Sequence, residues 1–373
     1  MSVLSRTPLS RTTIRRTAVI PRTAVRTAVR RTSVLGIAAA LLVLTGCSSD
    51  ATDDAASTIV RTTTSIAGAA VLGIERDTAT ACPAATAPDA GAGPAVKRHV
   101  VHTAGVAEVP SDPQRIVVLD SASMDAVCAL GLWERVVGAA TGVDSPQPSY
   151  LGFGISEIPS VGPVSAPDVS AIKAAAPDVI LGSSPASADL YSQLNAVAPT
   201  VFAGSDPVYW KAQFALSAQA LGRSAAATAQ LDRYQQDARQ LGEALNAAQT
   251  QASVVRFGAG DLEIEGPATF AGQVLSDIGA QRPPVQRLTD TTTAVVPADD
   301  LSSADGDLIY VLFNGPSGLE HGTEVMKSDQ WHELGAAAGR TFVAEDQIWN
   351  GNGITAAYAM LADLQRTLNG YAS

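Results

Sequence analysis

The stretch RIVVLDSASMDAVCALG, residues 115–131, decides the fold class. It opens with a short apolar run, residues 115–119, of the kind that forms a buried strand. The following residues carry apolar side chains at helical spacing, and Gly131 ends the pattern. This helical face consists of Met124, Val127, Cys128 and Leu130. A buried strand that leads directly into such a helix indicates a mainly parallel sheet covered by helices on both faces.

The same alternation of strands and helices continues to residue 368. Further strands are expected at residues 136–140, 179–181, 199–202, 252–257, 262–264, 308–313 and 342–344. Further helices are expected at residues 168–176, 190–197, 208–221, 225–249, 270–279 and 354–368. We therefore predict an α/β protein with an N-terminal lobe at residues 99–206, linking helices at residues 207–250 and a C-terminal lobe at residues 251–373. The helix over residues 225–249 is about 25 residues and roughly 37 Å long, enough to cross a domain.

The first 47 residues have the pattern of an export signal. They contain eight arginines and no acidic residue, and the apolar run at residues 34–44 is far shorter than the ~20 residues that span a bilayer. Leu44-Thr45-Gly46-Cys47 looks like a bacterial lipobox, in which the cysteine sulfur is lipidated. We predict a signal peptide at residues 1–46 and a palmitate-type lipid anchor on Cys47, on the extracytoplasmic face of the cell membrane.

Several details of this leader stay open. An ordinary signal peptide or a buried helix with a chance cysteine has the same apolar run. Arg30-Arg31 is a loose match to a twin-arginine signal, so the sequence does not decide between the general and the twin-arginine export routes. A translation start near Val34 is also compatible with the sequence.

Charge and cysteine content bear on the exported part of the chain. Removal of the eight leader arginines leaves 25 − 8 = 17 basic residues against 36 acidic ones, a net charge of −19, which disfavours nucleic-acid binding.

Residues 48–97 are rich in Ala, Thr, Ser, Asp, Gly and Pro, so residues 47–98 are expected to form a lipid-anchored tether. Residues 66–74 are nevertheless apolar enough to pack on the body. Cys82 and Cys128 are expected to form a disulfide; two separate thiols, with Cys128 buried, are the alternative.

Catalytic and metal-binding patterns are missing from the sequence. There is no Gly-x-Ser-x-Gly elbow, phosphate loop or dinucleotide-binding Gly-x-Gly-x-x-Gly, and Ser170-x-x-Lys173 lacks its partner motifs and reads as a solvated helix face. The histidines have no metal-site spacing and are expected at the surface, with a haem ligand among them left open. They are His99, His102, His321 and His332. We predict a protein that is not an enzyme and has no intrinsic metal or cofactor.

A ligand-binding role remains, and its residues are expected just after the strands, because ligands of open α/β sheets bind beyond the carboxyl ends of the strands. The aromatic planes and guanidinium groups in these positions suit a large, planar, anionic ligand. Each also has a structural alternative: a core position for Trp349, a turn cap for Tyr150 and a solvated charge for each arginine. The candidate ligand-binding residues are Ser121, Tyr150, Ser183, Phe257, Phe270, Arg282, Arg287, Asn314 and Trp349.

Four segments in order are similar to those of ferric-siderophore-binding proteins. The first segment consists of Val109-Pro110, then Pro113-Gln114-Arg115-Ile116-Val117-Val118-Leu119-Asp120, and then Ala129-Leu130-Gly131. The others are Ala166-Pro167-Asp168 with Ala176-Pro177-Asp178-Val179-Ile180-Leu181, then Asp307-Leu308-Ile309-Tyr310-Val311, then Trp331, Gly339-Arg340 and Trp349. The chain thus resembles FecB-like iron-dicitrate or siderophore-binding lipoproteins of ABC importers, in the class III periplasmic-binding-protein family, over residues 99–368.

The resemblance implies two Rossmann-like lobes, a long backbone helix and a ligand cleft between the lobes. It implies a monomer that captures a ferric siderophore or related iron chelate, whose own atoms complete the iron coordination, and the same placement of Cys82 and Cys128. It also implies docking onto an ABC permease through one acid on each lobe, but here only Asp299 is present, since Ser170 replaces the first-lobe glutamate. Two alternatives remain: a haem or other tetrapyrrole as ligand, or a cell-envelope interaction protein that has lost transport.

Overall fold

The computed structural model of the chain describes residues 64–93, 95–142, 147–184 and 187–369. The chain divides into two compact units, residues 1–59 and 60–373, and the described residues all belong to the second. The predicted signal peptide, Cys47 and the first part of the predicted tether lie outside the described residues. In the described part of the chain, no helix is both long enough and apolar enough to cross a membrane.

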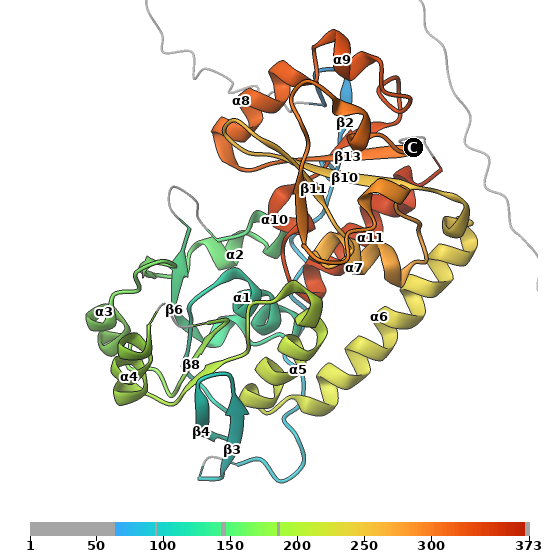
Figure 1. Cartoon of the computed structure of the whole chain (residues 1–373). Helices are drawn as coiled ribbons and strands as arrows, with labels where there is room; N and C mark the ends of the chain where they lie inside the picture. The colour runs from blue at the N-terminus through green and yellow to red at the C-terminus, as the bar shows by residue number, and fades with distance from the viewer. Residues whose placement is uncertain (1–63, 94, 143–146, 185–186, 370–373) are drawn as a thin grey trace, which may run out of the picture. The chain divides into compact units, whose positions relative to one another are not determined.

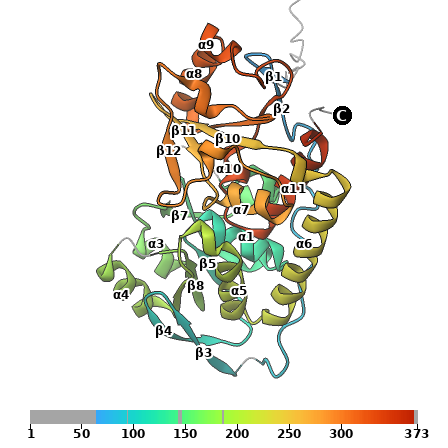
Figure 2. The ribbon, with the colours of Figure 1, turned by 45° about the vertical axis from the view of Figure 1, so that its right-hand side comes forward.

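In the described part of the N-terminal lobe, five parallel strands form a sheet in the order β7-β6-β5-β8-β9. The strands are β5 (Ile116–Val118), β6 (Val136–Thr141), β7 (Ser160–Pro163), β8 (Val179–Gly182) and β9 (Thr200–Phe202). The helices are α1 (Ser121–Ala129), α2 (Phe153–Ser156), α3 (Val169–Ala174) and α4 (Ala188–Val197). Alternate strand residues face opposite sides, so α1 covers one face of the sheet and α3 and α4 cover the other (Figures 1 and 2). An antiparallel hairpin, β3 (Lys97–His102) and β4 (Gly105–Pro110), precedes this sheet.

The C-terminal lobe contains a seven-stranded mixed sheet among its described residues, in the order β1-β2-β14-β13-β10-β11-β12. Its first two strands, β1 (Ser65–Ile66) and β2 (Ala69–Val71), come from the segment that precedes the N-terminal lobe. The strands of this lobe are β10 (Ala252–Phe257), β11 (Leu262–Glu265), β12 (Thr293–Val295), β13 (Leu308–Phe313) and β14 (Thr341–Val343). The helices are α7 (Phe270–Asp277), α8 (Gly315–Val325), α9 (Asp329–His332), α10 (Asp346–Trp349) and α11 (Ile354–Thr367). Strands β2, β14, β13 and β10 run parallel, whereas β10 and β11 form an antiparallel pair. The predicted α/β class with two lobes is confirmed.

Helices α5 (Trp210–Leu221) and α6 (Ser224–Ala244) link the two lobes. Helix α6 contacts both of them (Figure 1): the Gln230 side chain donates to the Ala129 carbonyl at 2.7 Å, and the Tyr234 hydroxyl donates to Asp277 at 2.9 Å. The helix has 21 residues and ends before the predicted residue 249, because Asn246 adopts a left-handed conformation with φ of 50°. Residues 247–249 form a separate 3-10 turn.

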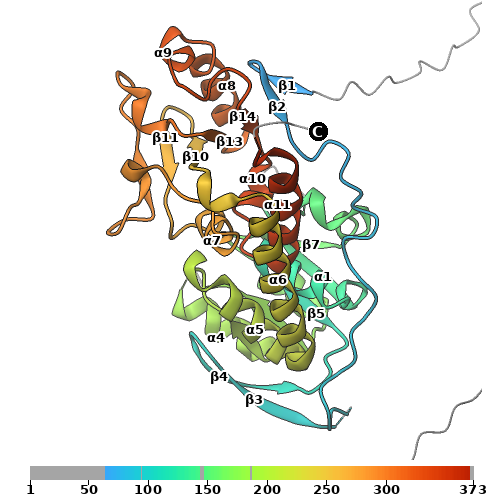
Figure 3. The same ribbon diagram turned by 90° about the vertical axis from the view of Figure 1, so that its right-hand side faces the viewer.

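Residues 64–93, which we call the strap, run from the C-terminal sheet to the N-terminal lobe (Figure 3). The strap contributes β1 (Ser65–Ile66) and β2 (Ala69–Val71), and β2 pairs in parallel with β14. Cys82 forms a disulfide with Cys128 of α1, so the alternative of two separate thiols is wrong. Part of the segment that we expected to be a free tether is therefore packed on the body, because its apolar residues complete the edge of a sheet.

Candidate functional site

A cavity of about 310 Å³ lies between the two lobes, where strands of both sheets end. The charged side chains among its described lining residues are Asp120, Arg256 and Asp346. Its polar lining includes Ser121, Gln147 and Asn350, and its apolar lining includes Ala140, Pro148 and Val164. This is the position at which open α/β sheets bind their ligands.

The C-terminal wall of this cavity is an arginine–aspartate pair. Arg256, on β10, donates from Nε to Asp346 Oδ1 at 2.6 Å and from Nη2 to Asp346 Oδ2 at 2.8 Å. Asp346 begins α10 and also accepts a hydrogen bond from the Asn350 side chain at 2.9 Å. The bidentate bond to Asp346 raises the pKa of Arg256. The guanidinium is thereby held in one orientation at the cavity wall.

The N-terminal wall is built around Asp120, which follows β5 and caps α1. Its Oδ1 accepts the Ser123 backbone N–H at 2.8 Å, and its Oδ2 accepts the backbone N–H of Ser183, which follows β8. An aspartate in this position satisfies an orphan donor of the helix and fixes the loop after the neighbouring strand. The residues after β5 and β8 are thus held together at one edge of the sheet.

Two further hollows adjoin this wall. One, of about 220 Å³, shares Asp120 and Val164 with the main cavity and includes Ser183 and Ser184. A narrower hollow shares Ser183 with this 220 Å³ hollow and is also lined by Ser123, Gln213 and Asn352. The ligand-sized space between the lobes is therefore lined mainly by hydroxyl, amide and apolar groups.

The model of the family described as periplasmic binding protein matches residues 116–347, well over half of the chain. The chain belongs to the periplasmic binding protein family. It is 30% identical over 286 residues to the "Probable siderophore-binding lipoprotein YfiY" of Bacillus subtilis (strain 168), and the match covers 72% of this chain and 86% of that protein. The resemblance drawn from the sequence is confirmed.

Solved structures of this family share the fold. Staphylococcus aureus SirA, complexed with staphyloferrin B, has a TM-score of 0.63 and 24% identity, and the match covers 73% of this chain and 98% of that one. The petrobactin-binding protein YclQ from Bacillus subtilis has a TM-score of 0.62 and 20% identity, covering 72% and 98%. FeuA from Bacillus subtilis, complexed with ferri-bacillibactin, has a TM-score of 0.60 and 18% identity, covering 74% and 99%.

Two of the serines predicted for the site line cavities at the strand ends. Ser121 lines the main cavity, and Ser183 lines the two hollows beside it. Asn314 is placed differently: it precedes α8, where its backbone N–H donates to the Phe257 carbonyl at 2.9 Å, and it does not line these hollows.

The four aromatic candidates do not face the cavity. Phe257 and Trp349 have no exposed surface, Phe270 is 1% exposed and Tyr150 is 2% exposed. Phe257 packs against Phe313 under α8, and Phe270 packs edge-to-face on Trp210. Trp349 donates from Nε1 to Asp363 at 3.1 Å. The prediction that these rings stack on a ligand is therefore wrong for this structure, because each ring completes a core instead.

The arginine candidates are also placed away from the cavity. Arg282 is 7% exposed and donates to the backbone carbonyls of Ala252 and Glu265. Burial lowers the pKa of Arg282 to about 10. Arg287 is exposed, and its Nε donates to the Arg282 carbonyl at 3.0 Å. Both side chains brace the loop between α7 and β12, and the arginine of the cavity is Arg256.

Tyr150 contributes to the contact between α1 of the N-terminal lobe and α11 of the C-terminal lobe. Its hydroxyl donates at 3.0 Å to Asp125, a fully buried carboxylate of α1. Asp125 also accepts the backbone N–H groups of Thr355 and Ala356, both at 2.9 Å, at the start of α11. A Cβ on Gly353 would lie 2.2 Å from the Asp125 carboxyl carbon, so a glycine is required for this close approach. Burial raises the pKa of Asp125 to about 6, although these donors favour its ionised form.

The remaining side chains singled out in the sequence do not form a site. Ser170 and Lys173 are exposed on α3, as expected for a solvated helix face. His102 is 7% exposed and packs against Tyr191, so the expectation of a surface position was wrong for this histidine. Among the described residues, no group of three or more His, Cys, Asp or Glu side chains could hold a metal ion.

Sequence reasoning missed Arg256 and Asp346. Arg256 interrupts the apolar run of β10, and a charge inside a buried strand was the available signal for it. Asp346 lies 90 residues further along the chain, so its pairing with Arg256 follows from the parallel order of β10, β13 and β14 rather than from any local pattern.

Proposed function

We propose that this chain is a lipid-anchored substrate-binding protein that captures a ferric siderophore between its lobes and delivers it to an ABC importer. The observation that carries the proposal is the cavity between Asp120 and Arg256, at the strand ends of both lobes. It occurs in a chain that is 30% identical to a probable siderophore-binding lipoprotein. Anchoring through Cys47 is supported by the lipobox and by the description of that relative as a lipoprotein.

In this role the protein binds its ligand and catalyses no reaction. The cavity offers hydroxyl and amide groups and a fixed guanidinium, which can bond to the periphery of a chelate. The chelate's own oxygen atoms would satisfy the iron, so the protein needs no metal ligand. Recognition by the outer surface of the chelate is compatible with a cleft that is open enough to release its cargo.

A steric block of the cavity tests this proposal. Ser121 is exposed at the first turn of α1, behind the cap Asp120, and lines the cavity. We expect Ser121→Trp to weaken the binding of ferric siderophores at least about tenfold, because the indole fills space that the chelate needs. Ser170→Trp is the matched control, since Ser170 is also exposed in the first turn of a helix capped by an aspartate, Asp168.

The measurement is a titration of the full-length protein in detergent with a panel of ferric chelates, followed by tryptophan fluorescence and by retention of iron-59 chelate. Binding that is lost in Ser121→Trp and kept in Ser170→Trp supports the proposal. If no ferric chelate binds to the folded protein, or if both variants bind equally well, the proposal is wrong.

Of the two alternatives, the tetrapyrrole ligand has lost its physical support. It rested on aromatic rings and guanidinium groups around a planar macrocycle, but those rings are buried in the core, and Arg282 and Arg287 do not line the cavity. The envelope-interaction role rests on Ser170, which is exposed on α3 at the position where the family resemblance implies an acid. Chelate binding without any contribution to iron uptake in cells would favour that role.

A further inference from the structure

Among the described residues that line the cleft, ionisable side chains are few and their charges nearly cancel. In this part of the chain the main cavity is lined by one arginine, Arg256, and two aspartates, Asp120 and Asp346. The two adjoining hollows add hydroxyl, amide and apolar groups, and their described lining residues include no Lys, Arg or His. Arg256 is thus the single cationic side chain among the described residues that line this space.

The positive charge of Arg256 is already matched. Two of its nitrogens bond to Asp346 at 2.6 and 2.8 Å, and the Asp346 carboxylate is held in place by Asn350. Glu263 lies opposite Arg256 in the register of β10 and β11, and the buried Glu265 lies two residues further along the same strand. The surroundings of the guanidinium are therefore acidic, and little of its charge is left to neutralise a ligand.

Asp120 contributes a further negative charge on the opposite wall. Its two carboxylate oxygens accept backbone N–H groups of Ser123 and Ser183, and the start of α1 offsets part of its charge. The described residues that line the cleft therefore carry a slight excess of negative charge. The chain as a whole is acidic as well, with 36 acidic against 25 basic residues.

This charge balance discriminates between classes of ferric siderophore. A ferric triscatecholate is a trianion, because each catecholate carries two negative charges, and ferric citrate complexes are anionic too. A ferric trishydroxamate has no net charge, because three singly charged hydroxamates match iron(III). Transfer of an anion from water into a cleft is costly unless cations there compensate for the lost hydration.

We infer that the cleft selects ferric chelates without net negative charge, the trishydroxamate class, over triscatecholates and citrate complexes. This inference rests on the proposed function. The hydroxyl of Ser121, the amides of Gln147 and Asn350 and the apolar Ala140 and Val164 suit the uncharged, peptide-like periphery of such a chelate. The solved relatives that bind other chelates share the fold at 18–24% identity, so the side chains of the cleft decide the class.

The test compares ferrichrome, an uncharged ferric trishydroxamate, with ferric enterobactin, a trianionic triscatecholate, and with ferric citrate, all on the full-length protein in detergent. We expect ferrichrome to bind at least about tenfold more tightly than either anion, with an affinity that is nearly independent of salt concentration. If ferric enterobactin or ferric citrate binds as tightly as ferrichrome, the inference is overturned and the proposed function stands. If none of the three binds but another ferric chelate does, the inference is overturned and the proposed function stands; if no ferric chelate binds, both are overturned.

Asp346→Asn supplies a second arm, because it removes the counter-charge of Arg256 without removing the arginine. We expect the ratio of enterobactin to ferrichrome affinity to rise about tenfold, and the enterobactin affinity to fall with added salt. Asp299→Asn, which removes one negative charge at an exposed position outside the cavity, should leave this ratio unchanged. An equal response of the two variants would show that net charge, rather than the cleft, sets the preference, and would contradict the inference.

Discussion

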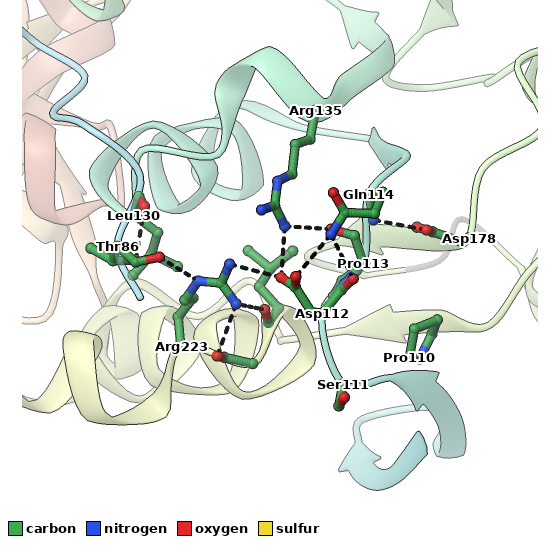
Figure 4. Close-up of polar contacts among 12 residues, drawn as sticks. Thr86, Pro110, Ser111, Asp112, Pro113, Gln114, Leu130, Arg135, Asp178 and Arg223 are labelled. Atoms are coloured by element: carbon green, nitrogen blue, oxygen red, sulfur yellow. Dashed lines mark hydrogen bonds and ion pairs between the residues drawn. The ribbon is translucent and has the colours of Figure 1, made fainter. Parts of the chain in front are cut away.

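At the scale of single residues, Asp112 joins the N-terminal lobe to the linking helices (Figure 4). Its Oδ1 accepts hydrogen bonds from Arg135 at 2.7 Å and from Arg223 at 2.8 Å. The side chain of Arg223 is 1% exposed and also donates to the carbonyls of Thr86 in the strap and of Leu221 and Gly222 at the end of α5. Asp112 therefore balances the charge of an arginine that water cannot reach.

We expect Asp112→Asn to lower the free energy of unfolding by about 2–3 kcal/mol, because Arg223 would remain buried without a counter-ion while partial exposure of Asp112 moderates the loss. Urea unfolding at neutral pH measures this change. Glu108→Gln is the control, since Glu108 and its partner Lys97 have side chains 55% and 57% exposed and such pairs contribute less than about 1 kcal/mol. Equal effects of the two substitutions would contradict the argument.

A second residue-scale prediction concerns Asp125. Burial raises its pKa to about 6 in the folded chain, whereas an unfolded aspartate has a pKa of about 4. Between these values the folded chain keeps a proton that the unfolded chain has lost, so the free energy of unfolding falls as the pH rises through this window. We expect this group to remove about 2–3 kcal/mol of stability between pH 4 and pH 7.

The measurement is urea unfolding at several pH values for the natural chain and for Asp125→Asn, which cannot ionise. The substitution should flatten the slope of stability against pH in the window between about pH 4 and 6. Asp290→Asn, at an exposed position, should keep the natural slope. An unchanged slope in Asp125→Asn would show that Asp125 is ionised throughout.

The site residues show what the sequence could reveal at this scale. Ser121 and Ser183 line cavities at the strand ends, as their positions after β5 and β8 led us to expect, and their part in ligand binding stays a prediction. Phe257 was wrong by one position: neighbouring residues of a strand face opposite sides, and Arg256 rather than Phe257 faces the cavity. The facing of a side chain depends on the packing of both layers, which one sequence does not contain.

At the scale of elements, the strap is fixed by an arginine as well as by its disulfide. Arg76 donates from Nη2 to Asp363 at 2.7 Å and from Nη1 to Glu345 at 3.3 Å. The side chain of Asp363 is 3% exposed, and its other oxygen accepts the Trp349 indole N–H. Burial raises the pKa of Asp363, and Arg76 opposes that rise. The strap thus supplies the counter-charge for a carboxylate buried in α11.

Loss of this contact should detach the strap from α11. We expect Arg76→Gln to lower the free energy of unfolding by about 2–3 kcal/mol and to speed hydrogen exchange at the amides of Val71 and Leu72, which bond to neighbouring backbone. Arg366→Gln is a matched control, because its partner Glu75 is also in the strap but the two side chains are 39% and 63% exposed. If both variants lose equal stability, Arg76 is a surface contact and the argument fails.

Strands and helices were the best-predicted level. The buried runs of β5, β8 and β13 are apolar on both faces, which marks central parallel strands directly in the sequence. The strap was harder, because β1 and β2 together hold few residues and derive their order from β14, hundreds of residues away. The composition of residues 48–97, rich in Ala, Thr and Pro, favoured a tether. Such a composition does not reveal that a short strand will pair with a distant part of the chain.

At the scale of the whole molecule, the open question is how the loaded protein meets its permease. The family resemblance implies one acidic contact on each lobe, and in this chain Asp299 and Ser170 occupy those positions; both are exposed. A single carboxylate gives weaker attraction to permease arginines than a pair, and the effect falls mainly on the rate of association. The two lobes would then contribute unequally to docking.

Two substitutions separate docking from capture. We expect Asp299→Asn to lower uptake of iron-59 chelate at least about fivefold in cells that produce the cognate permease, and Ser170→Glu to raise it, while the affinity of the purified protein for the chelate stays the same in both. Asp329→Asn, an exposed aspartate in α9, controls for a loss of surface charge. Uptake that is insensitive to Asp299 but abolished by Ser121→Trp would place the permease contact elsewhere on the surface, because capture would then be required and this acid would not.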